Sequence, residues 1–269
     1  MSENVQLQLS PSRISDFQQC PQLYKYRAID KLPERPGLDA LRGSLVHLVL
    51  EKLFHLNSND RTFDKACELL TPAWEELIEE DINLLCALDH DMVFPITKRT
   101  DVEQDLVTKL FNESKDLLAN YFGIEDPTKI EPDSLEELIE FDLSEKTKLK
   151  GFVDRIDKSP QGWLRVNDYK TGKSPKENFS AKAMFQLKFY AVVIYKKSGV
   201  LPKLLRLIYL KDSQILTYEP NEQDIIQTLA KVSNIEESIN NAKVTNTWPT
   251  KVSKLCDYCY FKKICPEFS

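Results

Sequence analysis

The chain has 269 residues, a formal net charge of −6, seven glycines and 42% hydrophobic residues. This composition is that of an ordinary globular protein and excludes the fibrous and disordered classes. Because no apolar run of about eighteen residues occurs, and residues 1–8 lack a basic start and an apolar core, we expect neither a membrane span nor a secretory signal, and therefore a cytoplasmic protein.

The negative charge is unevenly distributed. Residues 146–211 contain 16 Lys and Arg against 4 Asp and Glu, so this segment is strongly basic although the whole chain is acidic. Such a segment favours a polyanionic partner at that one place. A solvated basic face is the alternative that the composition leaves open.

Two short helices are expected near the start of the chain. Ser10-Pro11 combines an N-cap residue with a first-turn proline, which predicts a helix from this point. Cys20-Pro21 breaks that helix, and residues 23–27, where aromatic and basic side chains alternate, are expected to resume it.

A longer helix is predicted over residues 38–57, where the apolar residues follow a helical period. Gly43 lies inside it, where a glycine lowers stability unless a neighbour packs closely against it. His47 lies one turn beyond Gly43, and from its position alone it is more readily a core or surface residue than a ligand.

Residues 63–91 and 98–121 are predicted to be helical and are rich in Asp and Glu. They hold no recognisable motif. We expect them to form a helical insertion that covers one side of a sheet, with a solvated acidic outer face.

The central feature is a predicted β-hairpin. Residues 151–157 and 164–170 are rich in β-branched and aromatic residues and flank a Ser-Pro-Gln-Gly turn. Alternation places Asp154 on one face of the first strand, and Asp168 followed by Lys170 on one face of the second. Antiparallel pairing can therefore bring the two carboxylates together.

Two neighbouring carboxylates are unfavourable unless a cation lies between them, and oxygen ligands suit Mg²⁺ or Mn²⁺. Lys170 can reach the same point and polarise a water molecule or a phosphate oxygen. This is the outline of a phosphodiesterase site, and a solvated hairpin face is the alternative. Residues 137–143 form a preceding strand, whose Glu140 is either a further ligand or an exposed residue.

The remaining elements are predicted as a helix over 181–198, strands over 204–210 and 215–218, and a last helix over 221–240. Gln186 and Tyr190 lie four residues apart and so share a helix face. Such a pair can hydrogen-bond a phosphate and stack on a base.

Six cysteines in a cytoplasmic chain argue against structural disulfides. Cys256, Cys259 and Cys265 cluster near the C-terminus, and Cys20, which like Cys265 precedes a proline, is the best candidate for a fourth ligand. Three clustered cysteines with one remote partner favour a [4Fe–4S] cluster, because a four-cysteine zinc site normally has two Cys-x₂-Cys pairs. A structural Zn²⁺ and unrelated cysteines stay open, and the other two cysteines are expected to be ordinary buried residues.

Taken together, these motifs resemble the PD-(D/E)xK nuclease superfamily, specifically the RecB/AddB-type exonuclease domain with a cysteine-held iron–sulfur cluster. The resemblance covers essentially the whole chain. Each motif alone is weak, but their joint occurrence in this order is specific: residues 12–21, 43–47, 151–157, 168–172, Gln186 with Tyr190, and the terminal cysteines.

The resemblance implies a role for each matching residue. The implied metal ligands are His47, Asp154 and Asp168, with the carbonyl of Tyr169 and the carboxylate of Glu140. Lys170 is implied to position or activate the attacking water. The implied contacts to nucleic acid are Gln186 and Tyr190, and the implied cluster ligands are Cys20, Cys256, Cys259 and Cys265.

The resemblance also implies a fold and its division. We expect an α/β, restriction-endonuclease-like core with a central mixed sheet flanked by helices, as a single nuclease domain over residues 1–269. Within it, residues 38–122 are the helical portion including the insertion, 136–219 the sheet and catalytic core, and 221–269 the C-terminal helix and cysteine cluster.

The implied function is that of a metal-dependent DNA exonuclease acting on DNA ends or single strands in recombination or repair. The sequence has no Gly-x-x-x-x-Gly-Lys-Ser/Thr loop, so an ATP-driven helicase would have to be a partner. The alternatives are a non-catalytic DNA-binding or scaffold subunit and an iron–sulfur redox sensor. The complete set of His47, Asp154, Asp168 and Lys170 favours the enzyme.

Overall fold

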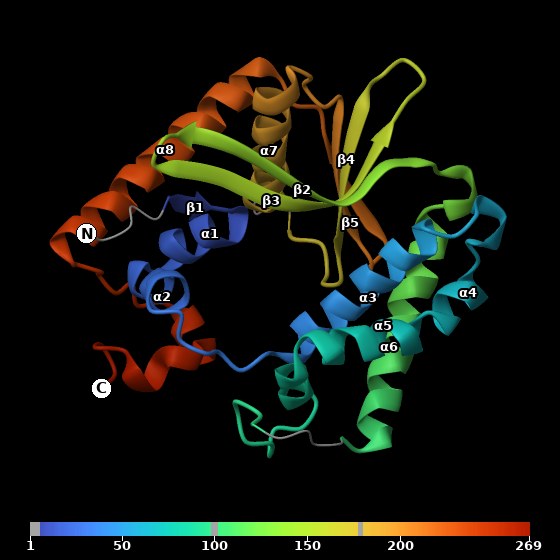
Figure 1. Ribbon diagram of the computed structural model, residues 1–269, viewed down its shortest axis with the longest axis horizontal. Coiled ribbons are helices and arrows are strands. Elements are labelled where there is room, and N and C mark those ends of the chain that lie inside the picture. Colours follow the sequence, from blue (N-terminus) through green and yellow to red (C-terminus); the bar gives the residue numbers. More distant parts are fainter. Residues whose placement is uncertain (1–5, 98–101, 177–179) are drawn as a thin grey trace.

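Six strands form one mixed sheet in the computed structural model, which describes residues 6–97, 102–176 and 180–269 (Figure 1). The strands are β1 (Leu7–Leu9), β2 (Pro132–Ser144), β3 (Thr147–Lys158), β4 (Leu164–Lys170), β5 (Leu204–Tyr209) and β6 (Gln214–Tyr218). Pairing is parallel between β1 and β3 and between β4 and β5, and antiparallel elsewhere. The predicted central mixed sheet is confirmed.

Strand β3 organises the sheet. Its partner β2 runs along one edge for nearly the full length of β3, while β1 and β4 pair with the two ends of the other edge. The sheet then continues through β5 to β6. The hairpin predicted over residues 151–170 is therefore the β3–β4 pair at the centre of the sheet.

Helices cover both faces of the sheet. They are α1 (Pro11–Gln19), α2 (Pro21–Tyr24), α3 (Leu38–Phe54), α4 (Phe63–Glu68), α5 (Leu70–Glu80), α6 (Gln104–Ile124), α7 (Ser180–Ser198) and α8 (Glu222–Thr245). Alternate residues of β5 separate two cores: Leu205 and Leu207 pack with α7 and α8, whereas Ile208 packs with α3 and α6. Figure 1 shows α7 and α8 apart from the α3–α6 group.

Most elements agree with the sequence pattern because the signals are local. Ser10 caps α1 by accepting a hydrogen bond from the Arg13 amide, and Asn221 and Asp224 form a capping box on α8. The segment 63–91 is not one helix: after α5 it continues as a 3₁₀-helix, Ile82–Ala87. Part of the predicted 98–121 helix, residues 98–101, lies outside the described residues.

Two local elements were not expected. Residues Leu7–Leu9 form the short strand β1, and α2 continues into a π-helical turn, Lys25–Ile29, rather than an ordinary helix. Three residues give too short an alternation to distinguish a strand from a coil, so β1 depends on its partner β3. Among the described helices, none is long and apolar enough to cross a membrane.

Gly43 has the close neighbour that its place inside a helix requires. A Cβ built on this residue would lie 3.3 Å from the Thr171 hydroxyl oxygen, tighter than an ordinary contact. The glycine thus lets α3 lie directly against the loop that follows β4. This contact brings His47, one turn further along α3, to the end of β4.

Candidate active site

Three carboxylates lie in a row across neighbouring strands. In the β2–β3 ladder Leu135 pairs with Arg155 and Glu137 with Val153, so Glu136 lies opposite Asp154. In the β3–β4 ladder Arg155 pairs with Asn167, so the next residue pair in that register is Asp154 with Asp168. Residues directly opposite each other point to the same face of a sheet.

The row lies where β3 and β4 separate. Their pairing stops at Arg155 and Asn167, and the Tyr169 amide donates instead to Asp154 Oδ2 at 2.6 Å. The carboxylate therefore replaces a strand carbonyl as the acceptor. Side chains from helices on both faces of the sheet reach this opening.

From α3, His47 joins two of the acids. Its Nδ1 lies 3.5 Å from Asp154 Oδ2, and one ligand atom each from His47, Glu136 and Asp154 lie within 4.8 Å of one another. An imidazole with carboxylates is a donor set that suits a divalent cation such as Mn²⁺. These residues form a candidate acidic metal site.

From the opposite face, α7 contributes Gln186, which connects three groups. Its amide Nε2 donates to Asp168 Oδ1 at 2.6 Å and to the Tyr190 hydroxyl at 2.8 Å, while its Oε1 accepts from Lys170 Nζ at 2.8 Å. Lys170 Nζ also lies 2.5 Å from Asp168 Oδ2. Gln186 thus fixes the carboxylate and the ammonium relative to each other.

The acids are held close enough to perturb one another. Burial, followed by the charge of Asp154, raises the pKa of Asp168 to about 6 and that of Glu136 to about 7. Burial lowers the pKa of His47, but the charge and hydrogen bond of Asp154 together with the charge of Asp168 outweigh it and raise that pKa to about 9. Asp168 Oδ2 is buried and accepts no hydrogen bond of acceptable geometry among the described residues. The charge that faces this oxygen in the structure is the Lys170 ammonium, 2.5 Å away.

A buried network supports Tyr169, whose carbonyl the resemblance assigns to the metal. Arg155, fully buried, donates from Nη1 to the Tyr169 hydroxyl at 2.6 Å and to Glu125 at 2.8 Å. Its Nε lies 2.9 Å from Asp157. These charge-assisted contacts fix the position of the Tyr169 side chain and so of β4 next to the site.

Glu140 is not brought to this group. It pairs with Lys150 in the β2–β3 ladder, four residues and thus about 13 Å along the strand from Glu136. Its carboxylate faces Lys148 at 3.7 Å. The acid of β2 that lies beside His47 and Asp154 in the structure is Glu136.

Glu136 could have been found only by knowing the strand register. With Ser144 opposite Thr147, a regular hairpin would place Glu137 opposite Asp154. A register shift between Asp142 and Ser144 moves the pairing by one residue, to Glu136. Glu136 also has a φ of 42°, in the left-handed region. Neither irregularity has a signature in the sequence.

Tyr190 is too buried to stack on a base. Its residue exposure is 4%, and its ring lies over Gly151, where a Cβ would be only 2.5 Å from Tyr190 Cε1. Gly151 therefore makes room for the ring, and Tyr190 holds Gln186. The aromatic residue that offers a free surface is Phe152, at 53% exposure.

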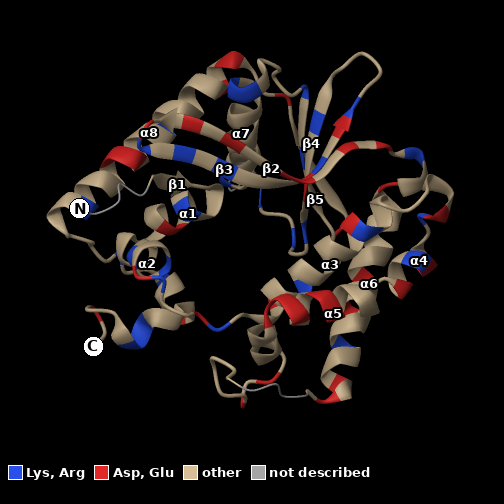
Figure 2. Cartoon of the chain, viewed as in Figure 1, with Lys and Arg blue, Asp and Glu red and all other residues tan. Residues whose placement is uncertain are grey.

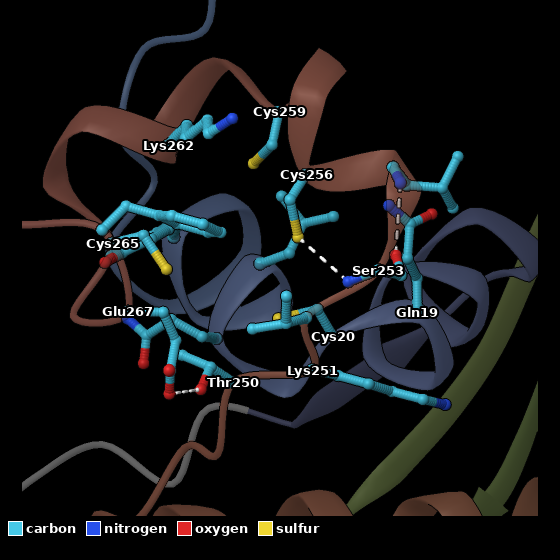
Figure 3. A pocket seen from close by; sticks show the side chains of 16 residues that line it. Gln19, Cys20, Thr250, Lys251, Ser253, Cys256, Cys259, Lys262, Cys265 and Glu267 are labelled. Atoms are coloured by element: carbon cyan, nitrogen blue, oxygen red, sulfur yellow. Dashed lines mark hydrogen bonds between the residues drawn. The ribbon is translucent and has the colours of Figure 1, made fainter.

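One pocket is lined by all four predicted cluster ligands, although Cys20 and Cys256 are 236 positions apart in the sequence (Figure 3). They are Cys20, Cys256, Cys259 and Cys265. Cys20 precedes α2, Cys256 lies in the 3₁₀ turn Lys254–Tyr258, and Cys259 and Cys265 directly follow that turn and the next one, Tyr260–Ile264. The Tyr26 hydroxyl donates to the Ile264 carbonyl at 2.9 Å and so ties the two chain ends together. Cys67 on α4 and buried Cys86 do not line this pocket.

No three of these four sulfur atoms lie all within 4.8 Å of one another among the described residues.

Comparisons with known proteins agree with this geometry. The family model for the PD-(D/E)XK nuclease superfamily matches residues 8–266. The Gene 69 protein of Mycobacterium phage L5 is 25% identical over 210 residues, which cover 69% of each chain. A crystal structure of a candidate exonuclease from Eubacterium rectale, 11% identical, covers 96% of this chain and 89% of its own with a TM-score of 0.57, and shares the fold. The chain belongs to the PD-(D/E)XK nuclease superfamily.

Proposed function

From this membership, we propose that the protein is a metal-dependent deoxyribonuclease of the RecB/AddB type that hydrolyses DNA at ends or in single strands. The single observation that carries the proposal is the row of Glu136, Asp154 and Asp168, with His47 and Lys170 at its margin. A scaffold subunit has no need of these side chains in one place.

The side chains fit one or two Mg²⁺ or Mn²⁺ ions. We assign His47, Glu136, Asp154 and Asp168 as the residues that would hold them, with the Tyr169 carbonyl as a further oxygen. A bound divalent cation would lower the pKa of a coordinated water and stabilise the charge that develops on the phosphate.

The chain's own groups have distinct roles in this scheme. Lys170 places a fixed positive charge beside Asp168, where it orients the attacking water or a phosphate oxygen. Gln186 hydrogen-bonds both Lys170 and Asp168 and so fixes their relative position, and the Tyr190 hydroxyl hydrogen-bonds Gln186. The two residues thus act on DNA hydrolysis by positioning.

We also propose that Cys20, Cys256, Cys259 and Cys265 hold a [4Fe–4S] cluster with a structural role. The support is their common pocket and their sequence pattern of three clustered cysteines with one remote partner. The cluster would join α2 to the C-terminal turns. Purified under anaerobic conditions, the protein should be brown and contain iron, whereas zinc without iron would point to a structural Zn²⁺ instead.

The decisive test of the nuclease is hydrolysis of end-labelled linear single-stranded and double-stranded DNA with Mn²⁺. Lys170→Ala should lower the rate by about 10²–10³-fold, as expected for a group that stabilises developing charge. Lys173→Ala, an exposed lysine on the same loop, is the matched control and should leave the rate unchanged. Equal rates for wild type and Lys170→Ala would show that the assigned site is wrong.

A second pair of variants separates the two candidate acids of β2. Glu136→Gln should reduce Mn²⁺-dependent hydrolysis by about tenfold or more, because it removes a ligand charge. Glu140→Gln, on the same strand, should not change it. The opposite ranking would restore Glu140 as the ligand.

We propose that an ATP-driven helicase is a partner of this chain, whose sequence has no Gly-x-x-x-x-Gly-Lys-Ser/Thr loop. We propose that the chain provides only the hydrolytic site and its groove for DNA.

A further inference from the structure

Two grooves of opposite charge meet at the candidate active site, and Phe152 and Lys170 line both. The first, which we call the basic groove, is lined by residues of α1, β3, α7 and α8 and contains no Asp or Glu among its described lining residues. Its further cations are Arg13, Lys150, Lys182 and Lys231.

These four cations of the basic groove have no carboxylate partner among the described residues, although Lys231 Nζ lies 4.0 Å from the centroid of the Phe185 ring. None has a described Asp or Glu oxygen within 4.0 Å, whereas lysines elsewhere on the molecule, such as Lys52 and Lys203, do. Burial and the nearby charge of Lys182 hold the pKa of Lys231 below its usual range. Positive charges that carboxylates of the described residues do not neutralise are complementary to a phosphate backbone.

The second groove, which we call the acidic groove, lies between α3 and α5. It is lined by Glu51, Glu76 and Glu80, beyond the site residues His47 and Glu136. Figure 2 shows acidic residues along α5 and basic residues on α1 and β3. A cation bound among the site residues would compensate Glu136, and Glu76 pairs with Lys52 at 2.5 Å. Glu80, on the same helix as Glu76, has no Lys, Arg or His nitrogen of the described residues within 4.0 Å.

The active-site side chains divide between the two grooves. Gln186 and Tyr190 line the basic groove, His47 and Glu136 line the acidic groove, and Lys170 belongs to both. A polynucleotide bound in the basic groove therefore reaches Lys170. Beyond Lys170 its phosphates would face the glutamates of the acidic groove, which carry charge of the same sign. Phe152, 53% exposed at the junction, offers an aromatic surface for the base that lies there.

We infer that the substrate strand binds on one side of the reacting phosphate only, in the basic groove, and that the acidic groove excludes its continuation. Cleavage is therefore directed to strand ends, since an internal phosphate would force a second polyanionic segment against α5. This inference rests on the proposed nuclease function and specifies how that site selects its substrate.

The test compares hydrolysis of linear and circular single-stranded DNA of the same sequence. Wild type should cut the circle at least about tenfold more slowly. The double variant Glu76→Gln/Glu80→Gln should raise the rate on the circle about fourfold at low ionic strength, from two charges roughly 10 Å from the strand. The gain should shrink as salt screens these charges.

Helix α5 offers a matched control. Glu75→Gln/Glu79→Gln makes the same charge change on the same helix, but these residues line a different pocket. This control should leave the ratio of circular to linear cleavage unchanged. Equal wild-type rates on the two substrates, no gain in the Glu76/Glu80 variant, or an equal gain in the control would each overturn the inference.

The basic groove is tested by binding of a fluorescent single-stranded oligonucleotide without metal. Lys182→Ala/Lys231→Ala should weaken binding and reduce the slope of log affinity against log salt by about 1.4, since each single-strand phosphate contact contributes about 0.7. Lys196→Ala/Lys197→Ala, at the other end of α7, should not change the slope. An unchanged slope for the Lys182→Ala/Lys231→Ala variant would show that the strand does not bind in the basic groove.

Failure of the nuclease proposal itself gives a different result. In that case wild type would not hydrolyse linear DNA with Mn²⁺, whatever its behaviour in the binding assay. If linear DNA is hydrolysed and the circle is cut equally well, the nuclease proposal stands and only the one-sided strand path is refuted.

Discussion

The substitution Gly151→Ala tests whether catalysis depends on the position of Tyr190. Gly151 lies on β3 beneath the Tyr190 ring, and an added Cβ would be 2.5 Å from Tyr190 Cε1. Ordinary van der Waals contact begins at 3.4 Å, so the ring must move by 0.9 Å or more. The movement is passed on, because Gln186 donates to the Tyr190 hydroxyl.

The expected magnitude follows from this displacement. Gln186 also binds Asp168 and Lys170, so a shift of Tyr190 moves the groups that position the reacting phosphate. A misplacement of about 1 Å costs roughly 10²-fold in rate. Overpacking should also lower the free energy of unfolding by about 1–3 kcal/mol, which leaves the protein folded at 25 °C.

The assay is hydrolysis of linear single-stranded DNA with Mn²⁺, together with thermal unfolding to confirm the fold. Gly123→Ala in α6 is the matched control, because nothing lies within 4 Å of an added Cβ there. If Gly151 acts through Tyr190, adding Gly151→Ala to a Tyr190→Ala protein should have little further effect. An equal loss in both backgrounds would refute the reasoning.

Three further outcomes are expected. Chelation with EDTA should abolish DNA hydrolysis and added Mn²⁺ should restore it, and activity that persists through EDTA dialysis would exclude the proposed metal site. Burial raises the pKa of Glu125, but Arg155 and Arg206 outweigh it and hold that pKa below 4.5. The stabilisation from ionised Glu125 is therefore complete above about pH 4.5 and is lost as the pH falls through the pKa of Glu125 in the folded protein. The free energies of unfolding of wild type and Glu125→Gln, measured with urea, should converge in acid. A difference between them that does not change with pH would contradict this. Cys20→Ser should lower the iron content and reduce the melting temperature by about 5–10 °C, whereas Cys67→Ser, outside the cysteine pocket, should retain the iron. Full iron content in the Cys20→Ser variant would show that Cys20 is not a ligand of the cluster.

Local sequence signals were sufficient for much of the fold and for part of the site. The alternation of the two hairpin strands placed Asp154 and Asp168 on matching faces, and in the structure both residues lie next to the point where the pairing of β3 and β4 ends. The four-residue spacing of Gln186 and Tyr190 placed both on one face of α7, where they hydrogen-bond. Period and spacing are properties of neighbouring residues, so the sequence contains them.

The resemblance to a family supplied what local patterns could not. Nothing within residues 38–57 distinguishes His47 from an ordinary helix residue, and its place 3.5 Å from Asp154 depends on the packing of α3 against the loop after β4. Cys20 and Cys256 likewise share a pocket across 236 residues of chain.

The tertiary structure alone decided which β2 acid reaches the site and how charge surrounds it. A one-residue register shift places Glu136 opposite Asp154. Strand register is set when the two strands pair, and the local sequence of either strand does not specify it. The sequence shows a basic segment between residues 146 and 211, but not that its lysines face a groove opposite the glutamates of α5. Composition records how many charges a segment carries, whereas the direction in which they face is determined only when helices and sheet pack together.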